Sequence, residues 1–204
     1  MLALLSNGIT SLALKEAIEK YVVGKKKAAV VVTADNEYKT KNYHIPRVIN
    51  ELTLYGLEVE LFDIDNQSPD LLLDYDVVEF IGGNPYYLLN AVRNCNAYSI
   101  LERIAKEKVL IGWSAGALVM SASIAVIDAF EPQMNFMNLT DLKGLCLAEV
   151  HIIPHYSKFL HRYEAFEEKL RRYEADNNCT LVRLNDGDGM LFEGGERLII
   201  KSNT

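Results

Sequence analysis

The stretch KVLIGWSAGALVMS, from Lys108 to Ser121, decides the fold and raises the functional question. The apolar run at residues 109–113 leads into the pentapeptide GWSAG at 112–116, and small helix-forming residues follow at once. A run that is apolar on both alternating faces is typical of a parallel strand that helices cover on each side. The stretch therefore predicts a buried strand that turns directly into a helix, with a serine at the turn.

The rest of the chain alternates in the same way. Strands are expected at residues 2–7, 28–34, 57–64, 77–82, 109–113, 149–155 and 180–185, and residues 189–201 are expected to form a hairpin. Helices are expected at residues 10–23, 43–55, 85–93, 99–106, 115–127 and 159–176. This alternation predicts an α/β three-layer sandwich with a mostly parallel sheet and ligands at the carboxyl ends of its strands. Because no repeat or linker interrupts the pattern, residues 1–204 are expected to form one domain.

Composition excludes several classes of function. The net charge is −7 and the pI is near 5.2, and the one basic cluster is GKKK at residues 24–27, so we expect no nucleic-acid partner. The three cysteines form no CxxC pair, which indicates reduced thiols in a cytoplasmic protein rather than a disulfide scaffold or a zinc site. The chain shows neither a signal-peptide pattern nor a membrane-spanning run, so no membrane partner is expected. The oligomeric state, monomer or homodimer, is left open.

The pattern Gly112-x-Ser114-x-Gly116 matches a nucleophile elbow, in which a strand precedes the serine and a helix follows it. Such a serine has a cramped backbone, and side chains two positions before or after it would clash with the adjoining strand and helix. The start of the helix supplies free backbone N–H groups, so the Ala115 amide is a candidate oxyanion donor. The alternative is a close-packed turn that carries its serine by chance.

A serine nucleophile needs a base, and the chain has four histidines. His155 ends the apolar run EVHIIPH, which places it at the carboxyl edge of a strand, where Ser114 is also expected to emerge. His155 is therefore the candidate base, and a capping or core histidine is the alternative. Of the others, His44 is expected at the surface, His151 in the core and His161 on an exposed helix face.

Two further turns could complete the site. Asp186 and Asp188 follow the strand LVRLN, and Asp186, the first of them, is the candidate acid that orients the base, although Asn-Asp-Gly is also ordinary turn chemistry. The turn Gly82-Gly83-Asn84 follows another strand and could bring a second backbone N–H to the oxyanion. Its spacing is not that of a dinucleotide-binding fingerprint.

Four segments, taken together and in this order, resemble peptidase E, the aspartyl dipeptidase family of serine peptidases related to cyanophycinase. They are LLSN at 4–7, IGGNPYYLL at 81–89, IGWSAGALVM at 111–120 and IIPHYS at 152–157. The resemblance implies Ser114 as nucleophile, His155 as base and the amides of Gly83 and Ala115 as oxyanion donors. It also implies a flavodoxin-like fold similar to class I glutamine amidotransferases, small peptides as substrates, and no metal or organic cofactor.

The chain departs from the family pattern at two places. The third triad position resembles a Leu-Pro-Glu-Gly turn in the family, whereas this chain has Leu-Asn-Asp-Gly at 184–187, and the Asp186 side chain is one methylene shorter. The arginine segment that follows the histidine in the family is not recognisable in YSKFLHRYEAF at 156–166. Arg162 or Lys158 could replace that arginine. The expected substrate-binding residues are Arg162 and, from the Gly82-Gly83-Asn84 turn, Asn84. Peptidase chemistry therefore carries over better than specificity for aspartyl bonds.

Other interpretations remain open at this point. The chain order Ser, His, acid differs from the Ser, acid, His order of α/β-hydrolases, but Asp128, Asp141 or Glu149 could supply that order. The rival functions are an esterase or amidase on the same elbow, and a catalytically silent protein that binds small peptides.

Overall fold

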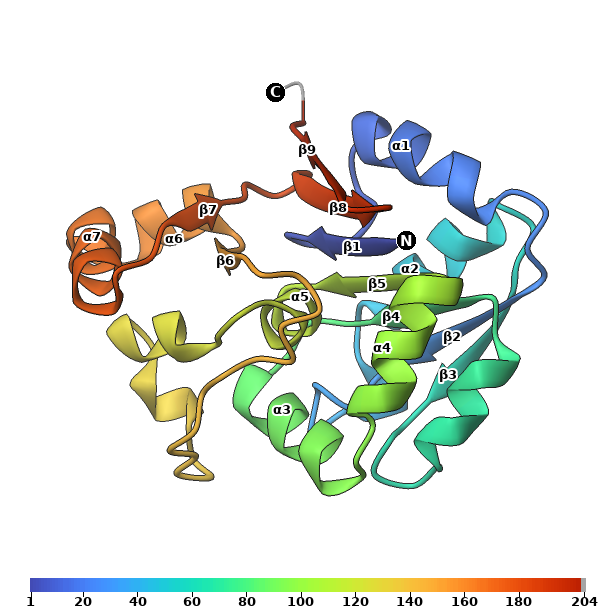
Figure 1. The fold of residues 1–204 in the computed structure, drawn as a ribbon, viewed down its shortest axis with the longest axis horizontal. Coiled ribbons are helices and arrows are strands. Elements are labelled where there is room, and N and C mark those ends of the chain that lie inside the picture. Colours follow the sequence, from blue (N-terminus) through green and yellow to red (C-terminus); the bar gives the residue numbers. More distant parts are fainter. Residues whose placement is uncertain (203–204) are drawn as a thin grey trace.

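The computed structural model describes residues 1–202, in which a seven-stranded sheet has the order β3-β2-β4-β5-β1-β8-β9 (Figure 1). Five of its strands are parallel: β1 (Leu2–Leu5), β2 (Lys27–Val31), β3 (Glu58–Phe62), β4 (Val77–Phe80) and β5 (Val109–Trp113). The predicted hairpin, β8 (Gly189–Glu193) and β9 (Glu196–Ile200), continues the sheet antiparallel beside β1. The mostly parallel sheet confirms the predicted α/β class.

Helices cover both faces of this sheet, because each face carries its own apolar cluster. One cluster joins the sheet to α1 (Leu12–Val22) and α2 (Ile45–Thr53). The other joins it to the remaining principal helices: α3 (Pro85–Asn94), α4 (Tyr98–Glu107), α5 (Ala115–Met120) and α7 (Phe166–Asn177). Four short 3₁₀ helices lie in the connections: η1 (Lys39–Lys41), η2 (Pro69–Asp74), η3 (Ala125–Ala129) and η4 (Pro132–Met134). None of the helices in the described part of the chain has the length and apolar character that crossing a membrane requires.

Strand β5 occupies the middle of the sheet and has the predicted bounds, Val109–Trp113. All five of its residues are buried, and Gly112 is level with Leu4 of β1 on one side and with Phe80 of β4 on the other. The residue that follows the strand, Ser114, therefore emerges at the carboxyl edge between two parallel neighbours. That edge is where open α/β sheets bind ligands.

Two predicted strands leave the main sheet. β6 (His151–Ile153) and β7 (Leu181–Arg183) pair only with each other, in parallel, within the described residues, and they lie with α6 (Tyr156–Arg162) and α7 at the left of Figure 1. Both strands are shorter than expected. Their carboxyl ends nevertheless lead to His155 and to the turn that carries Asp186.

Two predicted helices are also shorter than expected. The helix expected at 115–127 ends at Met120, because the returning segment 144–147 donates backbone hydrogen bonds to the carbonyls of residues 119–122. The helix expected at 159–176 is divided into α6 and α7. Ala165, which separates the two, has a φ of +51°, and a left-handed residue cannot continue a right-handed helix.

Candidate active site

Ser114 has the strained backbone that an elbow requires. Its φ of +52° and ψ of −114° lie outside the regions that residues with a Cβ ordinarily occupy. A Cβ on Gly112 would lie 2.7 Å from the Gly116 backbone, and a Cβ on Gly116 would lie 2.5 Å from the Phe80 carbonyl oxygen. The two glycines therefore stand where the turn passes too close to its neighbours for any side chain, as the pattern predicts.

His155 and Asp186 are in contact. His155 Nδ1 lies 2.6 Å from Asp186 Oδ1, so one imidazole nitrogen is paired with a carboxylate and Nε2 is left for a reacting partner. His155 also has a left-handed backbone, with a φ of +55°. This arrangement matches the geometry of a base held by an orienting acid.

Ser6 joins both members of this pair to the end of β1. Its buried hydroxyl accepts the His155 backbone N–H at 2.8 Å and lies 3.0 Å from Asp186 Oδ1, to which it donates. The following residues hold the same turn, since Asn7 Oδ1 accepts the Gly187 N–H and the Ser11 hydroxyl donates to the Gly187 carbonyl oxygen. The LLSN segment thus positions the acid-bearing turn.

Asp188, the other candidate acid, is engaged elsewhere. Its carboxylate is almost fully buried and accepts hydrogen bonds from the Asn185 N–H, from Ser202 and from Lys201 Nζ. These contacts tie the turn to the C-terminal segment rather than to His155. Of the two aspartates, Asp186 is the one in contact with the histidine.

The pKa of Asp186 is lowered from its ordinary value. Burial by itself raises this pKa, but the hydrogen bonds from His155 and Ser6 and the nearby charge of Lys158 outweigh the effect of burial. The carboxylate form is therefore favoured, which is the form that orients an imidazole and stabilises its positive charge.

Ser114 and His155 line the same cleft, whose volume is about 520 Å³. A smaller cavity of about 100 Å³ lies behind them and is walled mainly by apolar side chains, among them Leu118, Ile127 and Phe159. Within residues 1–202, no hydrogen bond joins the Ser114 hydroxyl to the His155 imidazole. In structures without substrate, catalytic hydrogen bonds are often long and shorten only in the complex.

Two residues that line this cavity, Gly83 and Ala115, have backbone amides without an acceptor in the described part of the chain. Gly83 has a φ of +151°, and a Cβ there would lie 2.3 Å from the Ala34 carbonyl oxygen. The neighbouring Asn84 amide donates to that same carbonyl, at 2.8 Å, and so pins the turn against the end of β2. The resulting pair of free donors beside Ser114 can stabilise a developing oxyanion.

The two expected substrate-binding residues differ in their surroundings. Asn84 caps α3, because its Oδ1 accepts the N–H groups of Tyr86 and Tyr87 and its Nδ2 donates to the Met134 carbonyl oxygen. Its side chain is thus occupied by contacts within the protein. Arg162 lines the cleft, is largely exposed, and lies 3.5 Å from Glu131 Oε1. Lys158 lines the same cleft.

One wall of the cleft was not predicted from the sequence. His44, expected at the surface, is half-buried, and its ring lies edge-to-face with the Trp113 ring at a centroid distance of 5.3 Å. Arg47 lies over the Trp113 ring, also 5.3 Å from its centroid. Burial, together with the charge of Arg47, lowers the pKa of His44. The signal available in the sequence was position, because residues 32–47 follow the carboxyl end of β2 and so had to pass the ligand-binding edge of the sheet.

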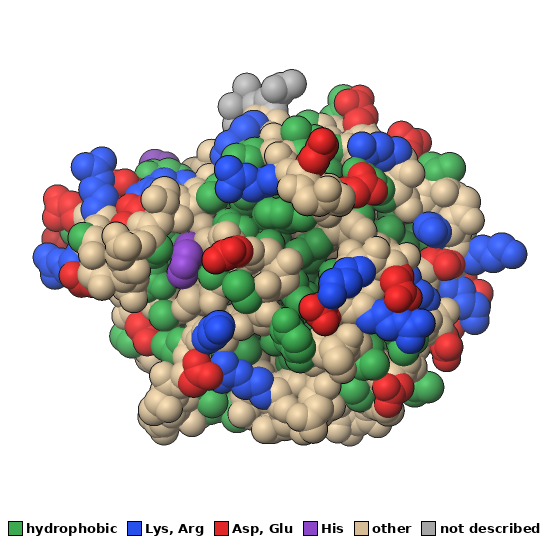
Figure 2. Space-filling model, in the orientation of Figure 1, with side chains coloured by type: hydrophobic (Ala, Val, Ile, Leu, Met, Phe, Trp, Pro, Cys, Tyr) green, Lys and Arg blue, Asp and Glu red, His purple; other side chains and the backbone are tan. Residues whose placement is uncertain are grey.

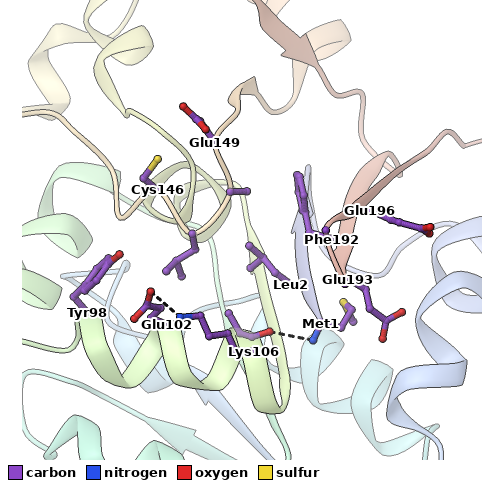
Figure 3. A pocket seen from close by; sticks show the side chains of 15 residues that line it. Met1, Leu2, Tyr98, Glu102, Lys106, Cys146, Glu149, Phe192, Glu193 and Glu196 are labelled. Atoms are coloured by element: carbon purple, nitrogen blue, oxygen red, sulfur yellow. Dashed lines mark hydrogen bonds and ion pairs between the residues drawn. The ribbon is translucent and has the colours of Figure 1, made fainter.

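A larger cavity, about 620 Å³, lies at the opposite end of the sheet, where β1 and β5 begin (Figure 3). Its rim is acidic, with Glu102 paired to Lys106 of α4 and with Glu149 and Glu193 at the edges. Apart from Glu149, one of the alternative acids, it contains none of the predicted site residues. On the face shown in Figure 2, acidic and basic side chains are interspersed.

Residues 1–202 contain no group of three or more His, Cys, Asp or Glu side chains that could hold a metal ion.

Comparison with known proteins identifies the family of this chain. The family model of Peptidase family S51 matches residues 2–200. An uncharacterized peptidase from Listeria monocytogenes serovar 1/2a is 36% identical over 107 residues, which are 50% of this chain and 52% of that protein. A peptidase E from Haemophilus influenzae (strain KW20 / Rd) is 28% identical over 153 residues, 72% of this chain and 68% of that protein. The match thus spans about half the length of the Listeria relative.

The fold also has a counterpart among solved structures. The 1.5 Å crystal structure of a candidate peptidase E protein from Listeria monocytogenes EGD-e is similar over 100% of this chain and 98% of that one, with a TM-score of 0.78 and 25% identity. A peptidase from an acI-B1 Actinobacterium has the same fold, with a TM-score of 0.70 and 18% identity, over 100% of this chain and 94% of that one.

Proposed function

This chain belongs to peptidase family S51, and we propose that it is a serine peptidase that hydrolyses small peptides with Ser114 as its nucleophile. The observation that carries the proposal is the pairing of His155 with Asp186, at 2.6 Å, on the wall of the cleft that Ser114 also lines. A serine at its ordinary pKa is a weak nucleophile, so a serine peptidase needs an oriented base at the same cleft. A turn that carries its serine only for packing would have no need of such a base.

In the proposed reaction, His155 Nε2 takes the proton of the Ser114 hydroxyl as the oxygen attacks the scissile carbonyl. The amides of Gly83 and Ala115 bind the oxyanion, and Asp186 stabilises the imidazolium. The imidazolium then gives its proton to the leaving amine, and an acyl-enzyme remains on Ser114. Water, deprotonated by His155, attacks this ester, which releases the acid product and restores the free serine.

We further propose that the preferred substrates are short peptides cleaved after an aspartyl residue. Cationic side chains line the cleft on the His155 side, where Arg162 and Lys158 could pair with a carboxylate in a charge-assisted contact. Arg162 is the stronger candidate, because a guanidinium binds a carboxylate in a bidentate manner. Asn84 would act indirectly, by holding the Gly83 turn through its cap on α3.

The test is a comparison of wild type with Ser114→Ala on a panel of Asp-Xaa dipeptides, dipeptides with other first residues, and simple esters. We expect the wild type to cleave Asp-Xaa substrates and the variant to lose at least a thousandfold in kcat, about the order seen when a triad member is removed. Unchanged peptide hydrolysis by Ser114→Ala would refute the serine mechanism.

Two further outcomes separate the proposal from its rivals. Ester hydrolysis without peptide turnover would favour an esterase on the same elbow. If the wild type fails to react with a serine-directed phosphonylating probe while it still binds small peptides, the protein is a binding module. The Arg162→Ala variant tests specificity separately, since it should raise KM for aspartyl substrates and leave other dipeptides unaffected.

A further inference from the structure

Glu79 is a buried carboxyl group for which the proposed reaction has no use. It lies in the central strand β4, its side chain has no exposed surface, and its neighbours in register are Val30 on β2 and Ile111 on β5. One oxygen, Oε1, accepts the indole N–H of Trp113 at 3.0 Å. The other, Oε2, is buried with no hydrogen-bond partner within the described residues. A buried charge with one unpartnered oxygen is costly, so the site favours a neutral acid.

The surroundings of Glu79 favour the same state. The charged groups that face it come from α2: Glu51, itself nearly buried, and Arg47, whose Nη1 donates to Glu51 Oε1 at 2.7 Å. Arg47 is therefore already paired with Glu51, whose Oε2 is a second buried oxygen without a partner. Burial first, and then the charge of Glu51, raise the pKa of Glu79 to about 8, while Arg47 and the bond from Trp113 act in the opposite direction.

Trp113 connects this carboxyl group to the reacting atoms. It immediately precedes Ser114, and its ring edge opposite the indole nitrogen lies against Gly82, where a Cβ would meet Trp113 Cζ3 at 2.6 Å. Gly82 in turn precedes Gly83, the proposed oxyanion donor. The ring is thus fixed at one edge by Glu79 and bounds the oxyanion turn at the other.

We propose that Glu79 is a positioning residue of the active site, which in its uncharged acid form holds the Trp113 indole so that Ser114 and the Gly82-Gly83 turn keep their reactive geometry. In the acid form, Oε2 carries the proton and Oε1 still accepts the indole N–H, so no unpaired charge is buried. Loss of the proton places a second negative charge beside Glu51 in an apolar layer. Relief of that charge requires α2 to move or water to enter, and either change disturbs the wall of the cleft formed by His44 and Arg47. The inference rests on the proposed serine mechanism.

The decisive measurement is the fluorescence of Trp113, which is the only tryptophan in the 204-residue chain. We expect the wild-type emission, excited at 295 nm, to titrate with a midpoint near pH 8 between pH 6.5 and 9.5. Glu79→Gln should abolish this transition, because the amide keeps an acceptor for the indole N–H but cannot ionise. Two neighbouring groups titrate outside this range, since the pKa of His44, beside the ring, is lowered and the pKa of Tyr55, near Glu79, is raised to about 12.

Activity and stability give two further readouts. The alkaline limb of kcat/KM, with its midpoint near pH 8, should disappear in Glu79→Gln, whereas Glu79→Met should lower kcat at pH 7 about tenfold or more, because the buried indole N–H loses its acceptor. Between pH 4.5 and 8 the folded wild type keeps a proton that the unfolded chain has released, so its stability falls as pH rises. Relative to Glu79→Gln, the wild-type unfolding constant should therefore increase about tenfold per pH unit in this window.

A failure of the role of Glu79 can be distinguished from a failure of the proposed serine mechanism. The fluorescence titration can be repeated in Ser114→Ala, where it should persist, so a failure of the serine mechanism does not erase it. A wild-type emission that is flat from pH 6.5 to 9.5, a transition that survives in Glu79→Gln, or equal loss of kcat in the Gln and Met variants would each overturn the role of Glu79. If a variant fails to fold, a flat wild-type emission still overturns the role of Glu79.

Discussion

Replacement of Ser6 by alanine tests whether the end of β1 positions the proposed base and acid. The Ser6 hydroxyl accepts the His155 N–H at 2.8 Å and donates to Asp186 at 3.0 Å, and the Ser6 side chain is fully buried. Ser6→Ala leaves the backbone N–H without a partner, which costs about 1–3 kcal/mol, and removes one bond to a charged group that water can replace in part. We expect the free energy of unfolding to fall by roughly 2–4 kcal/mol.

The effect on the reaction should exceed that of a general loss of stability. The contact from Ser6 holds His155 in its left-handed conformation, and a shift of the imidazole of about 1 Å can cost on the order of a hundredfold in rate. We expect kcat in Ser6→Ala to fall by about tenfold to a hundredfold, with a smaller change in KM. The assay is steady-state hydrolysis of a dipeptide substrate, at a temperature well below the unfolding midpoint of the variant.

Ser11→Ala is the matched control. Its hydroxyl donates to the Gly187 carbonyl oxygen at 2.7 Å and caps α1, so the variant loosens the same turn without removing a contact to His155 or Asp186. It should lose about 1 kcal/mol of stability and retain kcat within about threefold. If Ser6→Ala keeps the wild-type kcat, or if Ser11→Ala loses as much, the hydroxyl of Ser6 does not position the pair.

Three further predictions concern the same site: a pair of aspartate variants, a glycine variant and an acid unfolding experiment. Asp186→Asn should lower kcat by about 10⁴ with the fold intact, because a neutral amide neither fixes the imidazole tautomer nor stabilises the imidazolium. Asp188→Asn should instead lower stability with kcat within about tenfold, because that buried carboxylate holds the C-terminal segment. Circular dichroism and steady-state kinetics on both variants would contradict us if the effects were exchanged. Gly83→Ala places a Cβ 2.3 Å from the Ala34 carbonyl oxygen, at a φ of +151°, and should displace the amide of residue 83. We expect kcat to fall by about 10²–10³, the cost of losing one oxyanion donor. Full activity of this variant would show that Gly83 is not part of the oxyanion site. Because the pKa of Asp186 is lowered in the folded state, its carboxylate stabilises the fold above pH 3.8, and this contribution is lost as pH falls through the lower pKa of the folded state. Acid unfolding of Asp186→Asn should lack that part of the pH dependence. An unchanged profile would argue against the contact with His155.

The sequence predicted the parts of the site that depend on local signals. Apolar residues on both faces of 109–113 and glycines on either side of Ser114 specify a buried strand and an elbow without reference to the rest of the chain. His155 and Asp186 were also proposed from position, since each follows the end of an apolar run. Asp186 was preferred over Asp188 as the first acid past the strand, and the structure places it beside the histidine.

The parts that were missed depend on contacts between distant segments. An apolar run indicates a strand but not its partner, so the separation of β6 and β7 from the main sheet could not be foreseen. The end of α5 at Met120 depends on backbone donors at 144–147, more than twenty residues away. His44 and Arg47 line the cleft because α2 packs against Trp113, and no pattern within residues 43–55 specifies that contact.

The division of the site between two sheets has a mechanical consequence. Ser114 belongs to the centre of the seven-stranded sheet, whereas His155 and Asp186 follow the two strands of the smaller one and meet the end of β1 at Ser6. The 2.6 Å contact between imidazole and carboxylate therefore lies within one unit, whereas the approach of Ser114 to His155 crosses from one sheet to the other. A single gap across the cleft, from hydroxyl to imidazole, would then set when proton transfer begins.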